Sequence, residues 1–197
     1  RDGFVSDGII SEIEYLSSAR KICFILKEVN DPDGGGWDLR DFVSKGARSQ
    51  TWNNITRWVK GIRALPSDLH WRNFDEISKK QRIDELQSIC VINLKKSPGT
   101  HTTDYSSLES VANEDKLLIQ RQFELYDPDI TICGGTGELF KSVANFHAVE
   151  WHMTSRGIWW FERSPKKYVI SYSHPEARVH KPLLVYGLID AVREICS

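Results

Sequence analysis

The sequence lacks the cysteine patterns that mark a metal or cluster-binding protein. It has four cysteines, but no two of them form a CxxC pair, and three lie inside apolar runs, at Cys23, Cys90 and Cys133. Buried free thiols are therefore expected, and the spacing disfavours a zinc or iron–sulfur site. We expect no metal and no other cofactor.

Long apolar runs and an excess of one charge are also missing. No apolar stretch approaches the roughly 18 residues of a membrane span, and no signal peptide is visible. We therefore expect a cytoplasmic protein without a membrane partner. The 26 basic and 27 acidic residues leave a net charge of -1, unlike a globally basic nucleic-acid binder, although local basic patches are compatible with it. With no internal repeat, the 197 residues fit one domain, residues 1–197, which we expect to be a monomer.

The sequence does contain short, continuous apolar runs, which are typical of strands buried on both faces. They cover residues 21–26, 89–94, 129–133 and 168–172. Helical patterns separate these runs, which indicates βαβ units and a parallel sheet covered on both faces. We predict an α/β fold with three αβα layers and a central four-stranded, mostly parallel sheet.

Local signals place some of the remaining elements. Ser106 and Glu109 have the spacing of a capping box at a helix start. Pro182 is expected in the first turn of a C-terminal helix. Residues 40–85 are long for one crossover and are expected to hold two helices, whereas residues 151–160 are expected to add a strand or a hairpin.

The first predicted strand ends in a loop that carries acidic residues and three consecutive glycines, residues 34–36. Glu28 and Asp31 are candidate catalytic residues, because a partly desolvated carboxylate at a strand end can orient or deprotonate a water. The glycines would let the backbone approach a ligand closely. Trp37 and Phe42 are candidates to stack on that ligand, and Phe42 suits the core equally well.

Polar residues and glycines follow the other predicted strands, so they are expected at the same edge of the sheet. His174 follows the last strand, where an imidazole can donate to an oxygen that gains negative charge. Asn93 ends the second strand and offers a donor and an acceptor to the edge of a base. A glycine-rich turn follows the third strand and can bind phosphate at a helix N-terminus; its members are Gly134, Gly135 and Thr136.

These four strand-end motifs, in this order, resemble those of the uracil-DNA glycosylase superfamily. Asn30-Asp31-Pro32 is similar to the QDP of the family motif GQDPYH, and Lys27-Glu28-Val29 is alternatively similar to the GEA of GEAPG. Residues 93–98 and 127–135 resemble the segments around the family's second and third strands, and His174-Pro175 matches the HP of its last motif.

The resemblance implies a DNA glycosylase that flips a base out of DNA, hydrolyses its N-glycosidic bond and leaves an abasic site. Either Glu28 or Asp31 would position the water, and His174 would stabilise the departing base. The base would be bound by Asn30, Trp37, Phe42 and Asn93. The DNA backbone would be held by Lys95, Gly134, Gly135, Thr136, Arg178 and Lys181.

The sequence departs from GQDPYH at the position of the tyrosine that, in the family, closes the pocket against bulky pyrimidines. Asp33 and three glycines follow Pro32 instead. We therefore expect a bulky modified base as substrate, such as glucosylated hydroxymethylcytosine in phage DNA, and a role in anti-phage defence. The alternatives are a uracil or damaged-base repair glycosylase, a non-catalytic nucleic-acid-binding module of the same fold, and a small-molecule hydrolase that binds phosphate at Gly134–Gly137.

Overall fold

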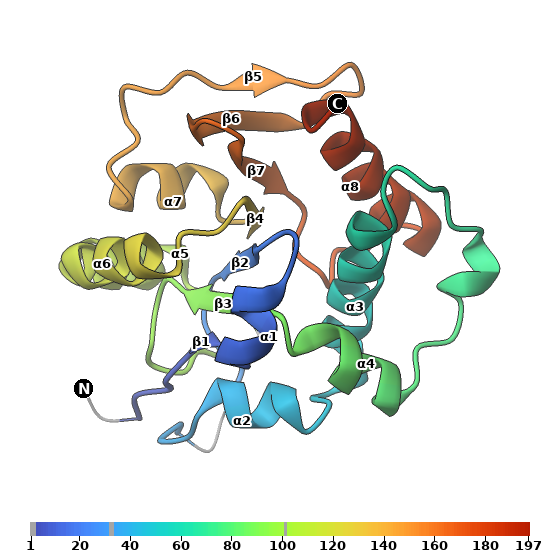
Figure 1. Cartoon of the computed structure of the whole chain (residues 1–197). Coiled ribbons are helices and arrows are strands. Elements are labelled where there is room, and N and C mark those ends of the chain that lie inside the picture. The colour runs from blue at the N-terminus through green and yellow to red at the C-terminus, as the bar shows by residue number, and fades with distance from the viewer. Residues whose placement is uncertain (1–2, 32–33, 101) are drawn as a thin grey trace.

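A computed structural model describes residues 3–31, 34–100 and 102–197. Within these residues the chain forms a mixed α/β structure around one sheet with the strand order β1-β3-β2-β4-β7-β6-β5 (Figure 1). The strands are β1 Gly8–Ile9, β2 Ile22–Leu26, β3 Ile89–Asn93, β4 Ile130–Gly134, β5 His152–Met153, β6 Trp159–Ser164 and β7 Lys167–Tyr172. The helices are α1 Glu12–Ser17, α2 Leu39–Ser44, α3 Ser49–Ala64, the 3-10 turn η1 Trp71–Asn73, α4 Lys79–Leu86, α5 Tyr105–Glu114, α6 Lys116–Tyr126, α7 Gly137–Val143 and α8 Lys181–Ile195.

The apolar runs of the sequence form the centre of this sheet. Strands β3, β2, β4 and β7 lie next to one another and pair in parallel. Every residue of β2, β3 and β4 is buried, which explains why these strands appear in the sequence as continuous rather than alternating apolar runs. The predicted α/β class is confirmed.

The predicted size and strand directions of the sheet were wrong. Across the described residues the sheet has seven strands rather than four, and three of its six neighbour pairings are antiparallel. Strand β1 has two residues, too few for any periodicity to be visible. Strands β5 and β6 form the hairpin expected from residues 151–160, and β6 then extends the sheet along β7.

Helices cover both faces of the sheet (Figure 1). Helices α3, α4 and α8 lie on one side, and α5, α6 and α7 lie on the other. Consecutive side chains of a strand point to opposite faces, and accordingly Phe24 and Ile25 of β2 belong to two different hydrophobic clusters. None of the helices in the described part of the chain is long and apolar enough to cross a bilayer.

Two of the expectations for the helices need correction. The residues between β2 and β3 form three α-helices and a 3-10 turn rather than two helices. Helix α5 begins one residue before the predicted cap, because the carboxylate of Asp104, not the hydroxyl of Ser106, accepts the first free N–H groups, those of Ser106 and Ser107. Pro182 lies in the first turn of α8, as predicted.

Substitution of Trp58, in α3, is a test of the hydrophobic core on the α3 side of the sheet. The side chain is fully buried, its ring stacks on Phe24 with centroids 6.2 Å apart, and its indole N–H donates to the carbonyl of Leu184 at 3.0 Å. We expect Trp58→Ala to lower the free energy of unfolding by about 3–5 kcal/mol, because it leaves a large cavity. The carbonyl of Leu184 keeps a second donor, the hydroxyl of Tyr172 at 2.9 Å.

Urea denaturation measures this change, and Trp159→Ala is the matched control. Trp159 is about half exposed, at 49%, so its removal should cost about 1 kcal/mol or less. Equal losses for the two variants would contradict the packing described here.

Candidate active site at the carboxyl edge of the sheet

A cavity of about 400 Å³ opens at the carboxyl ends of β2 and β3. Strand β2 lies between β3 and β4, so the connections that leave β2 and β3 run in opposite directions along the sheet. In open α/β sheets this switch point is where ligands bind. The lining comes from the ends of β2 and β3, the region of α2 and the start of α3, the residues before α5, and the loop after β7.

The backbone around the cavity is held by pairing that continues beyond the strands. The N–H of Leu94 donates to the carbonyl of Leu26 at 2.9 Å, and that of Lys95 donates to Lys27 at 3.0 Å. Further on, the N–H of Gly99 donates to the carbonyl of Val29 at 2.8 Å. Backbone pairing with the chain after β3 therefore continues past the end of β2 as far as Val29.

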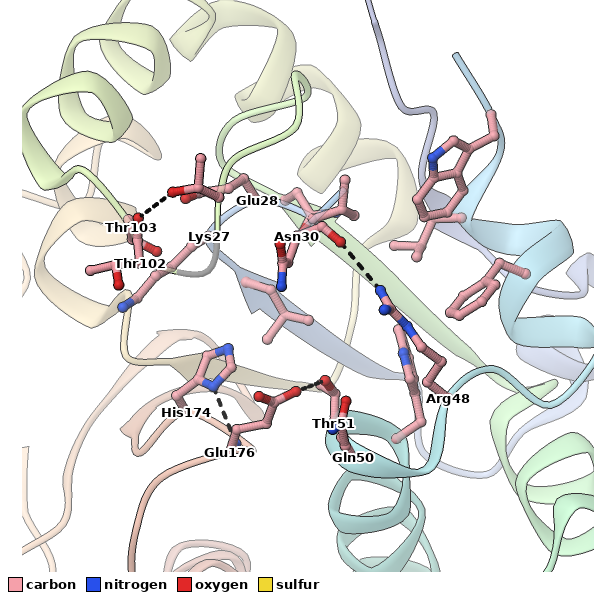
Figure 2. A pocket seen from close by; sticks show the side chains of 18 of the residues that line it. Lys27, Glu28, Asn30, Arg48, Gln50, Thr51, Thr102, Thr103, His174 and Glu176 are labelled. Atoms are coloured by element: carbon pink, nitrogen blue, oxygen red, sulfur yellow. Dashed lines mark hydrogen bonds between the residues drawn. The ribbon is translucent and has the colours of Figure 1, made fainter. Parts of the chain in front are cut away.

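Glu28 lies on this fixed segment and lines the cavity (Figure 2). Its Oε2 atom is buried and has no hydrogen-bond partner among the described residues. Gly99 makes the space for this side chain, since a Cβ atom at position 99 would lie 2.5 Å from Cγ of Glu28. A buried carboxylate oxygen without a partner is costly, and such groups are typical of sites that wait for a ligand or a water.

Asp31 is placed differently from Glu28. Its Oδ2 atom accepts the indole N–H of Trp37 at 2.6 Å and the N–H of Gly35 at 2.9 Å. It is not among the residues that line the cavity. The structure thus brings Glu28 to the cavity and gives Asp31 bonds that hold its own loop.

The glycine run in that loop serves the packing of the chain. Gly34, Gly35 and Gly36 all have positive φ angles, between 79° and 102°. A Cβ atom on Gly35 would lie 2.1 Å from the carbonyl oxygen of Gly3. We expected the backbone of these glycines to approach a ligand closely; at Gly35 it approaches the N-terminal segment instead.

His174 follows β7 and faces the same cavity as Glu28 (Figure 2). Its Nδ1 atom accepts the N–H of Glu176 at 3.1 Å. Burial lowers the pKa of His174, the carboxylate of Glu176 opposes this shift, and the positive charge of Lys27 adds to it. The imidazole is therefore neutral near pH 7, and because Nδ1 is an acceptor, the proton is on Nε2.

The four predicted base-binding residues all line the cavity. Asn93, the last residue of β3, is 2% exposed. The rings of Trp37 and Phe42 pack against each other with centroids 5.6 Å apart, and Arg48 lies 6.0 Å from the Phe42 ring. Arg48 also donates to the carbonyl of Asn30 at 3.2 Å, so these residues form one continuous aromatic and polar wall.

Several lining residues were missed by the sequence analysis. Figure 2 shows them around the same space, with Arg48, Gln50 and Thr51 on one side and Lys27 and Thr102 on the other. They lie at helix starts and in loops, where no local pattern marks them; Lys27 is the exception, because it directly follows a predicted strand. The missed polar residues are Lys27, Arg48, Gln50, Thr51, Thr100, Thr102, Thr103, Tyr105 and Glu176.

In the predicted phosphate-binding turn, polar groups form hydrogen bonds to other parts of the chain. The N–H of Gly135 donates to the carbonyl of Tyr172 at 2.8 Å and to that of Cys133 at 3.0 Å. The hydroxyl of Thr136 donates to the carbonyl of Ile25 at 2.8 Å. Gly134 allows close packing, since a Cβ atom there would lie 2.9 Å from Leu26.

The other predicted DNA-contact residues are not among those that line the cavity. Arg178, in the loop after β7, and Lys181, the first residue of α8, are exposed. Lys95 is half-buried in the segment paired with Lys27. These three side chains come from the same edge of the sheet as Glu28 and His174.

The described residues contain no cluster of three or more His, Cys, Asp or Glu side chains suited to a metal ion. Cys23, Cys90 and Cys133 are buried in the central strands. Burial raises the thiol pKa of Cys23 and Cys133.

A scan against models of known protein families finds no match to this chain, and a search of curated proteins finds no relative. Its function is therefore inferred from its own residues and geometry.

The unpartnered carboxylate of Glu28 gives a test that needs no substrate. We expect Glu28→Gln to raise the free energy of unfolding by about 1 kcal/mol, because the buried Oε2 atom has no partner among the described residues and a neutral amide costs less there than a charged oxygen. The measurement is urea denaturation at neutral pH.

Glu176→Gln is the control for this variant. Glu176 is exposed and accepts from the hydroxyl of Thr51, so its exchange should change stability by about 0.5 kcal/mol or less. A clear loss of stability in Glu28→Gln would mean that the carboxylate is held by a favourable partner.

Proposed function

We propose that the chain is a DNA glycosylase that hydrolyses the N-glycosidic bond of a flipped-out base and leaves an abasic site. The main support is that one cavity contains both the unpartnered carboxylate oxygen of Glu28 and the neutral imidazole of His174. Cleavage of this bond needs a group that activates water and a group that stabilises the departing base. The ordered strand-end motifs, which resemble those of the uracil-DNA glycosylase superfamily, support the same activity.

Each step can be assigned to a residue of the cavity. The bond between C1′ and the base nitrogen breaks, and its electron pair goes to the nitrogen. The oxygen of a water bonds to C1′, and the carboxylate of Glu28 accepts the proton that the water loses. The Nε2–H of His174 donates to the base oxygen that gains negative charge. The base anion then takes up a proton from solvent and leaves as a neutral molecule, and Glu28 releases to solvent the proton that it accepted.

Asp31 acts in this proposal as a positioning residue. Its bond to the indole N–H of Trp37 fixes one ring of the aromatic wall. Trp37 and Phe42 would contact the flipped base, and Asn93 would read its polar edge.

The cavity favours a base larger than uracil. Its volume of about 400 Å³ is in the range that holds drug-sized ligands. Polar side chains at the start of α3, Gln50 and Thr51, line it opposite Lys27 (Figure 2), where they can bind the hydroxyl groups of a substituent. We therefore propose a bulky modified base as substrate, such as glucosylated hydroxymethylcytosine in phage DNA, which would make the enzyme part of anti-phage defence.

The DNA backbone would be held by cations at the same edge of the sheet, of which Arg178 and Lys181 are exposed and Lys95 is half-buried. Arg178 and Lys181 follow β7, and Lys95 follows β3. With a net charge of only -1, attraction to DNA must come from such a local group. Binding should therefore weaken as the salt concentration rises.

The activity is tested by an abasic-site assay on labelled DNA that contains uracil, hypoxanthine, hydroxymethylcytosine or glucosylated hydroxymethylcytosine. We expect product only from the bulky base. Glu28→Gln should lower the single-turnover rate by about 10²–10⁴-fold, since it removes the group that accepts the water proton. Asp31→Asn should lower this rate less, because an amide oxygen can still accept the indole N–H of Trp37.

The other outcomes separate the alternatives. Product from uracil would support a repair glycosylase and overturn the argument from cavity size. DNA binding without abasic product would indicate a non-catalytic module of this fold. If Asp31→Asn lowered the single-turnover rate more than Glu28→Gln did, Asp31 would be the catalytic carboxylate and Glu28 the positioning residue.

The state of His174 predicts a pH dependence. The active form is neutral, so the rate should fall as the pH drops through the pKa of His174, which burial places below its ordinary value. Protonation would put a hydrogen on Nδ1, where the N–H of Glu176 now donates.

The measurement is the single-turnover rate across pH 5 to 8, with His174→Gln as the comparison. That variant keeps an N–H donor but cannot titrate, so the acidic limb should disappear, while the rate should fall by less than the roughly 10²–10³-fold that loss of a donor costs. A rate that rises on acidification would show that the imidazolium is the active form.

A further inference from the structure

The end of β2 contributes a second candidate catalytic group to the cavity, beside Glu28. We propose that Lys27 is a further catalytic residue whose ammonium group stabilises the base as it departs, and that Tyr105 holds this ammonium in place. This inference rests on the proposed glycosylase function and deepens it.

The position of Lys27 is fixed at its backbone and at the end of its side chain. Its carbonyl accepts the N–H of Lys95 at 3.0 Å. Its Nζ atom donates to the hydroxyl of Tyr105 at 2.5 Å and lies 4.4 Å from the centre of that ring. Tyr105 is 59% exposed, but it is the first residue of α5, whose N-terminus is capped by Asp104, so the backbone that carries the acceptor is fixed.

The partner of this ammonium is a neutral hydroxyl rather than a carboxylate. In the described part of the chain, Nζ of Lys27 forms no ion pair, unlike Lys96, which pairs with Asp7 at 2.6 Å. The positive charge is therefore not neutralised locally and can act on a ligand. In a cavity from which a bound base excludes water, that interaction is stronger than in solution.

Lys27 and His174 lie against the same glycine. A Cβ atom on Gly135 would be 3.6 Å from Cε of Lys27 and 3.8 Å from Cβ of His174. The two side chains therefore share one side of the cavity, and the charge of Lys27 is close enough to lower the pKa of His174. The other charged groups that line the cavity are Glu28, Arg48 and Glu176.

This arrangement divides the stabilisation of the leaving group between two residues. When the bond between C1′ and the base nitrogen breaks, the electron pair makes the base an anion. A neutral imidazole offers a hydrogen bond but no net charge, whereas Lys27 offers a full positive charge. The same charge disfavours protonation of His174, so the cation also keeps its neighbour in the donor form.

The test compares the single-turnover rates of four variants on the DNA that the wild-type enzyme cleaves. Lys27→Met removes the charge at similar length and should lower the rate by about 10²-fold. Lys27→Arg keeps the charge and should stay within about tenfold of the wild type. Tyr105→Phe keeps the ring but removes the hydroxyl that accepts from Lys27, and it should lower the rate less than Lys27→Met does. Lys80→Met removes an equal charge from the exposed surface of α4 and should leave the rate unchanged.

The pH profile distinguishes catalysis from a structural role. In Lys27→Met the acidic limb should move to higher pH, because the charge that opposes protonation of His174 is gone; in Lys27→Arg it should stay in place. Should Lys27→Met fail to fold, Lys27→Gln replaces it. If the wild type releases no base from any DNA, the glycosylase function and this role both fail. An active wild type whose Lys27→Met variant has the same rate and the same acidic limb would overturn the role of Lys27 alone.

Discussion

The rest of the structure depends on the in-register pairing of the central parallel strands. Leu26 of β2 lies opposite Asn93 of β3, and Gly134 of β4 lies opposite Tyr172 of β7. Because these strands end at the same level, the segments that follow them meet at one edge. Pairing of Leu94 and Gly99 with the chain after β2 extends this order past the strands, and it is this extension that gives Glu28 and Lys27 a fixed backbone.

Buried polar contacts support the same edge from the other side of β3. The carboxylate of Asp7, which is completely buried, accepts the N–H of Asn93 at 2.7 Å, Nζ of Lys96 at 2.6 Å and the amide of Gln122 at 2.9 Å. A buried charge is tolerated only when it is paired in this way. Asp7 thereby joins the N-terminal segment, the end of β3 and α6 through one carboxylate.

The sequence predicted the parts of the molecule that a local pattern can encode. Strands buried on both faces leave continuous apolar runs, so β2, β3, β4 and β7 could be recognised, and the polar residues just after them could be assigned to one edge. A two-residue strand such as β1 leaves no pattern. The cavity residues from other elements, such as Thr51, Tyr105 and Glu176, owe their place to how helices dock, which no short segment of sequence records.

Asp31 and Glu28 looked equivalent in the sequence because both are acidic residues after one strand; the structure separates them by the direction of their side chains.

The cavity gathers features that reduce stability unless a ligand uses them. The Oε2 atom of Glu28 is buried without a partner among the described residues, His174 is desolvated enough to lower its pKa, and the Glu28 side chain occupies the space that a Cβ atom at position 99 would need. Elsewhere at this edge, polar groups such as those of Asp7, Gly135 and Thr136 are satisfied within the protein. That contrast is the physical reason for proposing the chemistry at Glu28 and His174, and for giving the glycine-rich turn after β4 a structural role.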